Sequence, residues 1–299
     1  MTRRRKRVIA ILGALVLLPP ALFAFNGLVL AAGTTPRVRD VAGVVPQGSP
    51  KAGEVTAVSY NIAKAFVHRG GLKFDSRDRV EARLRKMAAT VRAENPDLVF
   101  LSEAITQCGP CNIDQVELLA REVGLPHAAT GENYNVGVPF YRVAGGNAIL
   151  SRVPLTPVAN FDLAGRRPFW VTKNNRRALA ASAEFGGRPV LLVALHNDSF
   201  DIRNNEAQVR QILDWLGDRP AMLAGDFNAM PNQPPMKLLR ESGRFAGEWG
   251  GAPTFFEGER KERIDYILAP AGWELVESKV IADDTSDHRP LVSRFRVMG

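Results

Sequence analysis

The chain has few of the side chains that build metal centres rich in sulfur and nitrogen. Its 299 residues include two cysteines and four histidines, a donor set that makes zinc a poor fit. There is no internal repeat and no low-complexity tract, which argues against a solenoid or a compositionally biased chain. With 45% hydrophobic and 23% charged residues, the composition is that of an ordinary globular chain that can bury one substantial core, or at most two.

The globular part also lacks a real excess of positive charge. The formal net charge is +8, and five of the 39 basic residues stand at positions 3–7, before the first apolar run. The remaining 34 basic residues face 31 acidic ones, so the excess falls to +3. A domain so close to neutrality offers no general electrostatic reason to bind DNA.

One long hydrophobic run follows the five amino-terminal charges. Residues 8–33 are apolar apart from Asn26, and 26 residues are enough to cross a bilayer. The basic residues in front of the run favour a cytoplasmic amino terminus, with the rest of the chain outside. Pro19 and Pro20 would kink a spanning helix, so a cleaved signal peptide remains an alternative. We predict an extracytoplasmic protein, secreted or membrane-anchored, with residues 1–33 as signal peptide or transmembrane signal anchor.

The rest of the chain mixes strand and helix patterns. Residues 34–53 are rich in proline and glycine with little periodicity, which predicts a linker. Apolar and β-branched runs predict strands at 54–61, 98–101, 146–151, 178–185, 189–196, 221–224, 264–268 and 290–297. Helical spacing predicts helices at 76–95, 112–123 and 204–216. Together these patterns indicate one α/β domain over residues 54–299.

The stretch Leu223-Ala-Gly-Asp-Phe-Asn-Ala-Met-Pro231 has the clearest chemical character. It opens as a buried strand, and Gly225 then lets the backbone turn. Asp226 and Asn228 follow two residues apart, and in an extended segment such residues point to the same side. A carboxylate and a carboxamide at the carboxyl end of a strand suit a hard cation and a phosphate better than a core.

Polar residues also follow the other predicted strands. They are Asn61, Glu103, Asn147, His196, and Asp265 followed later by Asp287-His288. One such residue after an apolar run means little, but six strand ends of this kind in one chain are difficult to explain by packing. We therefore expect them to gather in one site.

The chemistry of these side chains suggests distinct roles. Glu103 and Asp287, with Asn61, offer hard oxygen ligands for Mg²⁺, which would polarise a phosphoryl oxygen and stabilise the leaving group. Asp265 would orient His288 and stabilise its imidazolium, so that His288 either abstracts a proton from water or binds the phosphate.

Other side chains would bind the developing charge. Asn228 and His196 would donate hydrogen bonds to the non-bridging oxygens. A basic and aromatic cluster over residues 166–177 offers a phosphate or lipid-headgroup contact, and the alternative is a solvated loop with one buried aromatic pair. We single out Arg177 from this cluster because it enters the strand pair that leads to His196.

These residues lie in motifs that resemble the endonuclease/exonuclease/phosphatase superfamily, which includes deoxyribonuclease I, abasic-site endonucleases, neutral sphingomyelinases and inositol polyphosphate phosphatases. The resemblance covers about residues 54–297, with the motifs in the family's order. The motifs are Ser59-Tyr-Asn61, Leu101-Ser-Glu103, Gly146-Asn-Ala-Ile-Leu-Ser-Arg152, Ala194-Leu-His196, Gly225-Asp-Phe-Asn228, Arg263-Ile-Asp-Tyr-Ile267 and Ser286-Asp-His288-Arg-Pro290.

The resemblance implies a four-layer sandwich in which two central, mostly antiparallel β-sheets are flanked by helices, with the site at one end. It also implies a Mg²⁺ site, with Mn²⁺ as the alternative ion, and phosphate contacts. The metal would lie among Asn61, Glu103 and Asp287, the phosphate and attacking water near Asp226 and Asn228, and Asp265 would pair with His288. Beside these, we expect Asn147 and Arg177 to bind the substrate phosphate. Either His288 or Asp226 would take the proton of the attacking water.

By resemblance, the expected activity is metal-dependent hydrolysis of a phosphodiester by activated water. The expected substrate is a nucleic acid or a phospholipid headgroup, and His196 resembles a histidine of the deoxyribonuclease and sphingomyelinase branches. We expect a monomer that contacts the membrane through its amino-terminal segment if that segment is uncleaved. The alternatives are a phosphomonoesterase for a small ester and a non-catalytic binding protein that kept the fold.

Cys108-Gly-Pro-Cys111 spells the thioredoxin dithiol motif. Thioredoxin-like sites open a helix after a strand, whereas here Thr106-Gln107 precede the motif in an expected loop. In an exported protein we expect a disulfide between Cys108 and Cys111 that pins the loop after Glu103, and a redox site is the alternative.

Overall fold

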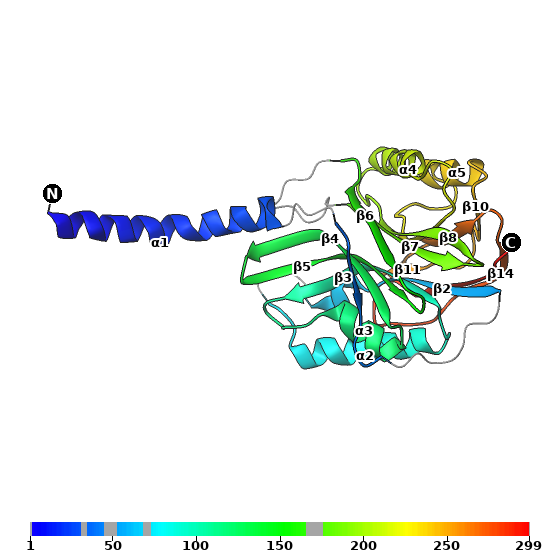
Figure 1. Cartoon of the computed structure of the whole chain (residues 1–299), viewed down its shortest axis with the longest axis horizontal. Helices are drawn as coiled ribbons and strands as arrows, with labels where there is room; N and C mark the ends of the chain where they lie inside the picture. The colour runs from blue at the N-terminus through cyan, green and yellow to red at the C-terminus, as the bar shows by residue number, and fades with distance from the viewer. Residues whose placement is uncertain (1, 31–34, 45–52, 68–72, 166–175, 299) are drawn as a thin grey trace.

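A long apolar helix projects from a compact domain (Figure 1). The computed structural model describes residues 2–30, 35–44, 53–67, 73–165 and 176–298. Helix α1 (Arg3–Leu28) runs without interruption through Pro19 and Pro20. Its most apolar 18 residues have a mean hydropathy of 2.5 and none of them is buried, so by length and composition it can cross a membrane.

Two sheets form the centre of the domain. The seven-stranded sheet has the order β1 (Arg37–Asp40), β4 (His127–Val138), β5 (Tyr141–Ser151), β3 (Leu98–Cys108), β2 (Glu54–Asn61), β15 (Leu291–Arg296) and β14 (Glu274–Val280). The six-stranded sheet has the order β10 (Phe245–Gly247), β13 (Asp265–Pro270), β9 (Ala221–Asp226), β8 (Arg188–His196), β7 (Arg177–Phe185) and β6 (Thr156–Asp162). Among the described residues, β2–β3 and β8–β9 are parallel pairs and the other neighbours are antiparallel.

Helices cover the two outer faces of the sheets. Helices α2 (Arg77–Arg92) and α3 (Gln115–Val123) pack on the seven-stranded sheet, and α4 (Ile202–Leu216) and α5 (Pro234–Glu241) on the six-stranded sheet. A third apolar cluster, which includes Phe100 and Leu192, fills the space between the sheets. These layers confirm the expected four-layer α/β sandwich.

Three small elements complete the domain. A short 3-10 segment, η2 (Ala63–Phe66), follows β2, and β11 (Phe255–Glu257) pairs with β12 (Arg260–Glu262) in a two-stranded sheet. The hairpin expected around Gly186-Gly187 is confirmed, because Phe185 pairs with Arg188 across that turn. Both glycines have positive φ, which a two-residue hairpin turn favours.

Some element boundaries differ from those expected. Part of the expected linker is strand β1, whose Val38 pairs with Ala129 of β4 and packs between the sheets. Non-local pairing of this kind leaves no periodicity in four residues of sequence. The helix expected from residue 112 begins at Gln115, because the Asp114 carboxylate accepts a hydrogen bond from the backbone N–H of Glu117 and caps it.

The two cysteines are free and buried in the structure, where a disulfide was expected. The thiol of Cys111 donates a hydrogen bond to Cys108, which lowers the pKa of Cys108 to about 7. The expected disulfide is therefore not formed in this structure. Cys108 is the last residue of β3, and α3 begins only after Asp114, so the motif does not open a helix as a thioredoxin-like site does.

Candidate active site

One edge of the six-stranded sheet carries three of the expected residues. His196 ends β8 and lies in register with Asp226, the last residue of the parallel strand β9. Strand β13 runs antiparallel to β9, so its first residue, Asp265, pairs with Asp226 at the same edge. Asn61, the last residue of β2 in the other sheet, donates from Nδ2 to Oδ2 of Asp226 at 3.0 Å. The site therefore spans the seam between the two sheets.

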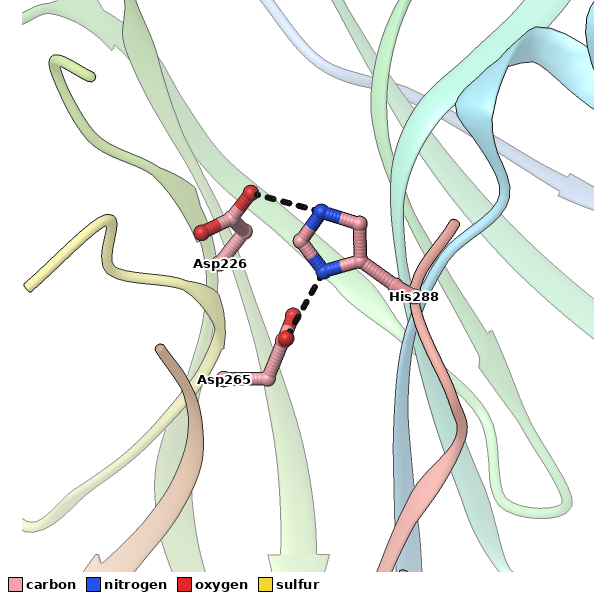
Figure 2. Close-up of side chains that lie close together, drawn as sticks. All are labelled: Asp226, Asp265 and His288. Carbon is pink, nitrogen blue, oxygen red and sulfur yellow. Dashed lines mark hydrogen bonds and ion pairs between the residues drawn. The ribbon is translucent and has the colours of Figure 1, made fainter. Parts of the chain in front are cut away.

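His288 lies between two buried carboxylates (Figure 2). Its Nδ1 is 2.8 Å from Oδ2 of Asp265, and its Nε2 is 3.6 Å from Oδ2 of Asp226. The hydroxyl of Thr254 fixes the approach of Asp265, because it accepts hydrogen bonds from the backbone N–H groups of Ile264 and Asp265. The expected Asp265–His288 pair is thus present in the structure, together with a positioning threonine that no sequence motif indicated.

Asp226, Asp265 and His288 shift one another's pKa values. Burial alone would lower the pKa of His288, but the carboxylates of Asp265 and Asp226 outweigh it and raise that pKa to about 10. Burial raises the pKa of the Asp226 carboxyl to about 7, although His288 opposes the shift. At neutral pH, His288 is therefore a cation, and Asp226 is poised to gain or lose a proton.

His196 has the opposite electrostatic character. Burial, followed by the positive charge of Arg176, lowers its pKa well below the ordinary value, so the imidazole is neutral. Its Nε2 lies 3.5 Å from Oδ2 of Asp226 and 3.9 Å from Oε1 of Glu103. A neutral imidazole in this place still has one N–H to donate.

Glu103 was expected at a strand end, but it lies in an irregularity inside β3. The pairing of β3 with β5 shifts register between Leu101 and Ala104, and Glu103 has φ of 56°. This left-handed conformation in a bulge turns the carboxylate toward the site. Burial opposes its ionisation, but the ammonium of Lys64, which donates to Oε2 of Glu103, gives the carboxyl a lowered pKa.

A polar cavity of about 550 Å³ joins these side chains. The expected site residues that line it are Asn61, Glu103, His196, Asp226, Asn228, Asp287 and His288. Asn228 lies beyond the end of β9 with φ of 47°, and its backbone N–H donates to Oδ1 of Asp226. A tight turn, and not the extended alternation expected from the sequence, therefore brings Asn228 into the cavity.

Two sets of donors could hold a divalent ion. Asn61, Glu103 and Asp287 offer oxygen atoms to the cavity from three separate segments, and oxygen is the donor that Mg²⁺ prefers. The ammonium of Lys64 on Glu103 shows that a cation suits this end of the cavity. The second set, Asp226, Asp265 and His288, has ligand atoms within 4.8 Å of one another. Within this set, Asp265 and His288 are already joined by the hydrogen bond between Oδ2 and Nδ1.

Arg176, and not Arg177, enters the cavity. Arg177 points away, with its guanidinium on Asp162 and on the carbonyl of Glu132. Arg176 is 9% exposed and donates to the hydroxyl of Ser199, while its buried Nε finds no hydrogen-bond partner among the described residues. Neighbouring residues of an extended chain face opposite ways, so a choice that is wrong by one residue selects the wrong face. The rest of the basic cluster, residues 166–175, lies outside the described residues.

Asn147 does not line the cavity either. It lies inside β5 and is 1% exposed. Its Nδ2 donates to the carbonyls of Arg177 at 2.8 Å and Ala194 at 3.2 Å. Because both carbonyls belong to the six-stranded sheet, Asn147 ties the two sheets together next to the site, and its expected phosphate contact stays a prediction.

Comparisons with known proteins agree with this architecture. The family model described as Endonuclease/Exonuclease/phosphatase family matches residues 58–288. The fold is similar to that of an endonuclease/exonuclease/phosphatase from Beutenbergia cavernae DSM 12333, with a TM-score of 0.65 and 24% identity over 82% of this chain and 72% of that one. No curated protein matches the chain in sequence.

Two further structures are similar over the length of this domain. Humanized D. rerio TDP2 gives a TM-score of 0.57 and 18% identity, covering 82% of this chain and 99% of that one. Sphingomyelinase C from Streptomyces griseocarneus gives a TM-score of 0.51 and 20% identity, also covering 82% and 99%. At such identities the likeness establishes the fold alone.

Proposed function

This chain belongs to the Endonuclease/Exonuclease/phosphatase family of phosphoesterase hydrolases, and we propose that it cleaves a phosphodiester outside the cytoplasm with the help of a divalent metal ion. The observation that carries the proposal is the cavity in which Asp226, a carboxyl with a pKa of about 7, adjoins His288, an imidazolium that is charged at neutral pH because its pKa is raised to about 10. Such a pair supplies a proton acceptor and a phosphate-binding cation within one site.

The proton of the attacking water goes to Asp226 in this mechanism. A general base works best when its pKa lies near the working pH, and the pKa of Asp226 is raised to about 7. His288 already carries a proton at that pH and cannot accept another, so its role is to bind a phosphoryl oxygen. Asp265 keeps that proton on His288 through the hydrogen bond to Nδ1.

Three other groups would stabilise the negative charge that develops on the phosphoryl oxygens. The guanidinium of Arg176 and the neutral imidazole of His196 line the cavity and would donate to the non-bridging oxygens. Mg²⁺, held by Asn61, Glu103 and Asp287, would act as a Lewis acid on a phosphoryl oxygen. Lys64 would have to leave the carboxylate of Glu103 as the ion binds, because the ammonium and the metal ion would compete for the same carboxylate oxygens.

The test uses the full chain in detergent micelles, with Mg²⁺ or with EDTA. Hydrolysis is measured on bis-(p-nitrophenyl) phosphate, plasmid DNA and sphingomyelin, with His288→Ala as the inactive variant. The matched control is His127→Ala, because His127 pairs with Asp40 at the far end of β1 and does not line the cavity. Metal-dependent turnover that His288→Ala abolishes and His127→Ala retains is the expected result, and the preferred substrate identifies the class. Turnover that survives His288→Ala would refute the assignment.

Export is proposed from α1 and the basic residues before it. The measurement is a fusion of alkaline phosphatase to the carboxyl terminus in a bacterial host, since that reporter is active only outside the cytoplasm. An inactive fusion that is nevertheless made in full would contradict export.

A further inference from the structure

Helix α1 has an apolar surface that the domain does not cover. Large side chains on every side of it are exposed, for example Leu15 (66%), Val16 (71%) and Leu18 (55%). A helix that is apolar all round is stable only inside a protein core or a bilayer. The single polar residue of the apolar run behaves differently, because Asn26 is fully buried.

Asn26 fastens the last turn of α1 to the domain. Its Nδ2 donates to the backbone carbonyl and to Oδ1 of Asn135 on β4, at 3.1 and 3.0 Å. Arg142 on β5 donates from Nη1 to Oδ1 of Asn26 at 3.4 Å, and its Nε donates to Gln107 on β3. We name Asn26, Asn135 and Arg142 the helix lock. Because the lock joins α1 to two neighbouring strands, it fixes the direction of the helix relative to the domain.

The lock sits beside a hairpin whose tip is exposed and aromatic. Val138 pairs with Tyr141, so Pro139 and Phe140 form the turn between β4 and β5. Phe140 is 76% exposed and Tyr141 is 55% exposed. In Figure 1 this tip reaches further toward the amino-terminal end of α1 than any other labelled part of the domain.

From these positions we propose that the β4–β5 hairpin tip, residues 138–141, is a contact surface for the lipid bilayer that α1 crosses. The proposal rests on the export proposed above and adds that α1 stays uncleaved as a membrane anchor; it does not rest on the proposed reaction. The 18 residues from Val8 to Phe25 make a helix of about 27 Å, close to the thickness of the hydrocarbon core. Asn26 then lies at its outer boundary, and the hairpin tip beside it lies among the headgroups. Aromatic side chains are enriched at this depth because their rings are amphipathic.

An apolar cavity of about 380 Å³ opens next to the tip. Its lining includes Phe74, Val136, Tyr141 and Val143, and Phe74 is itself 40% exposed. On an ordinary soluble surface such a cluster would face water at a cost in free energy. Against a bilayer it continues the apolar surface of the hairpin tip, so lipid is the occupant that suits both features.

The test places a tryptophan at the tip in the full chain, reconstituted in phosphatidylcholine vesicles. The variant is Phe140→Trp, and the matched control is Val276→Trp, at a 39% exposed position on β14, an edge strand of the same sheet that is separated from β5 by three strands. Emission is compared in vesicles with and without brominated acyl chains. We expect the tryptophan introduced by Phe140→Trp to lose about half of its added emission, as a ring at interfacial depth should, and Val276→Trp to lose none.

The outcomes separate this inference from the proposed reaction. Equal emission loss in the two variants, or a mature protein that lacks α1 by mass spectrometry of the membrane fraction, would overturn the bilayer contact. Asn26→Leu keeps α1 apolar but removes the helix lock. Combined with Phe140→Trp, it should lower the quenching toward the value of the control variant. Unchanged quenching in the double variant would refute the lock. Turnover of bis-(p-nitrophenyl) phosphate is also recorded for the parent chain and for each variant. If the parent chain shows no turnover, that result counts against the proposed reaction but leaves the quenching result intact.

Discussion

The substitution Asp265→Asn tests the central electrostatic claim about the site. It keeps the shape of a side chain that is 1% exposed, but it removes the charge that lies 2.8 Å from Nδ1 of His288. Hydrogen bonds to charged groups contribute about 1.5–3 kcal/mol to stability. Since one pKa unit corresponds to about 1.4 kcal/mol, the pKa of His288 should fall by about 1–2 units from its value of about 10.

Expressed as a free energy, the loss of activity should exceed the loss of folding stability. With a pKa of about 8–9, His288 of Asp265→Asn stays protonated at pH 7, but it is no longer oriented toward the phosphoryl oxygen. Loss of one preorganised donor costs about 10²- to 10³-fold in kcat. We therefore expect kcat of Asp265→Asn to be about 10²-fold lower or more, and its unfolding free energy to be lower by about 2 kcal/mol.

The stability of the protein should depend on pH through the charge of His288. The folded pKa of His288 is raised above its unfolded value, so its contribution to stability is complete below about pH 6.5 and is lost as the pH rises toward about 10. The unfolding free energy of the parent chain should therefore fall over this range, and Asp265→Asn should make that fall smaller.

The assay is the pH profile of kcat on a soluble phosphodiester. In the parent chain, activity should rise near pH 7 as Asp226 ionises and decline near pH 10 as His288 loses its proton. Asp265→Asn should move the alkaline limb to lower pH, whereas Asp162→Asn, which makes the same chemical change beside Arg177, should not. A value of kcat within about threefold of the parent, or an unmoved alkaline limb, would refute the reasoning.

Three further predictions use other parts of the site. Arg176→Gln should lower kcat/KM by about 10²-fold in steady-state kinetics while Arg177→Gln changes it little, and equal effects would contradict the placement of Arg176 in the cavity. Glu103→Gln should raise the half-saturating Mg²⁺ concentration by about 10-fold or more. Lys64→Gln should lower that concentration, because the competing ammonium is gone. A shift of the same sign in both variants would disprove the competition between Lys64 and the metal ion. Thr254→Val leaves two buried N–H groups without their acceptor and should cost about 2 kcal/mol in urea denaturation, whereas an unchanged midpoint would show that Thr254 does not position Asp265.

The sequence predicts the site better than it predicts the conformations that build it. Polar residues directly after apolar runs, such as Asn61 and His196, do end strands, because a run of buried residues specifies a central strand and its length. Glu103 reaches the cavity by another route, a bulge with a left-handed residue inside a long strand. Nothing in the local sequence requires that bulge, since it follows from the pairing of β3 with β5.

The positions of Arg177 and Asn147 outside the cavity have one physical origin. In a strand each residue faces the opposite side from its neighbour, so a role depends on knowing the register to within a single residue. Sequence periodicity located the strands that hold Arg177 and Asn147, but it did not determine which side chain faces the cavity and which faces the other sheet. Only the packed structure decides between Arg176 and Arg177.

The position of the site on the seam between two sheets has a consequence for how this protein can be altered. Asn61 belongs to one sheet and Asp226 to the other, and their hydrogen bond spans the gap. The width of that gap is set by apolar side chains that do not line the cavity, such as Phe100 and Leu192. A smaller or larger residue there changes the distance between the two halves of the site before it unfolds the domain. Variation in the core is thus a way to tune turnover, and a search for stabilising core substitutions will meet losses of activity that no active-site residue explains.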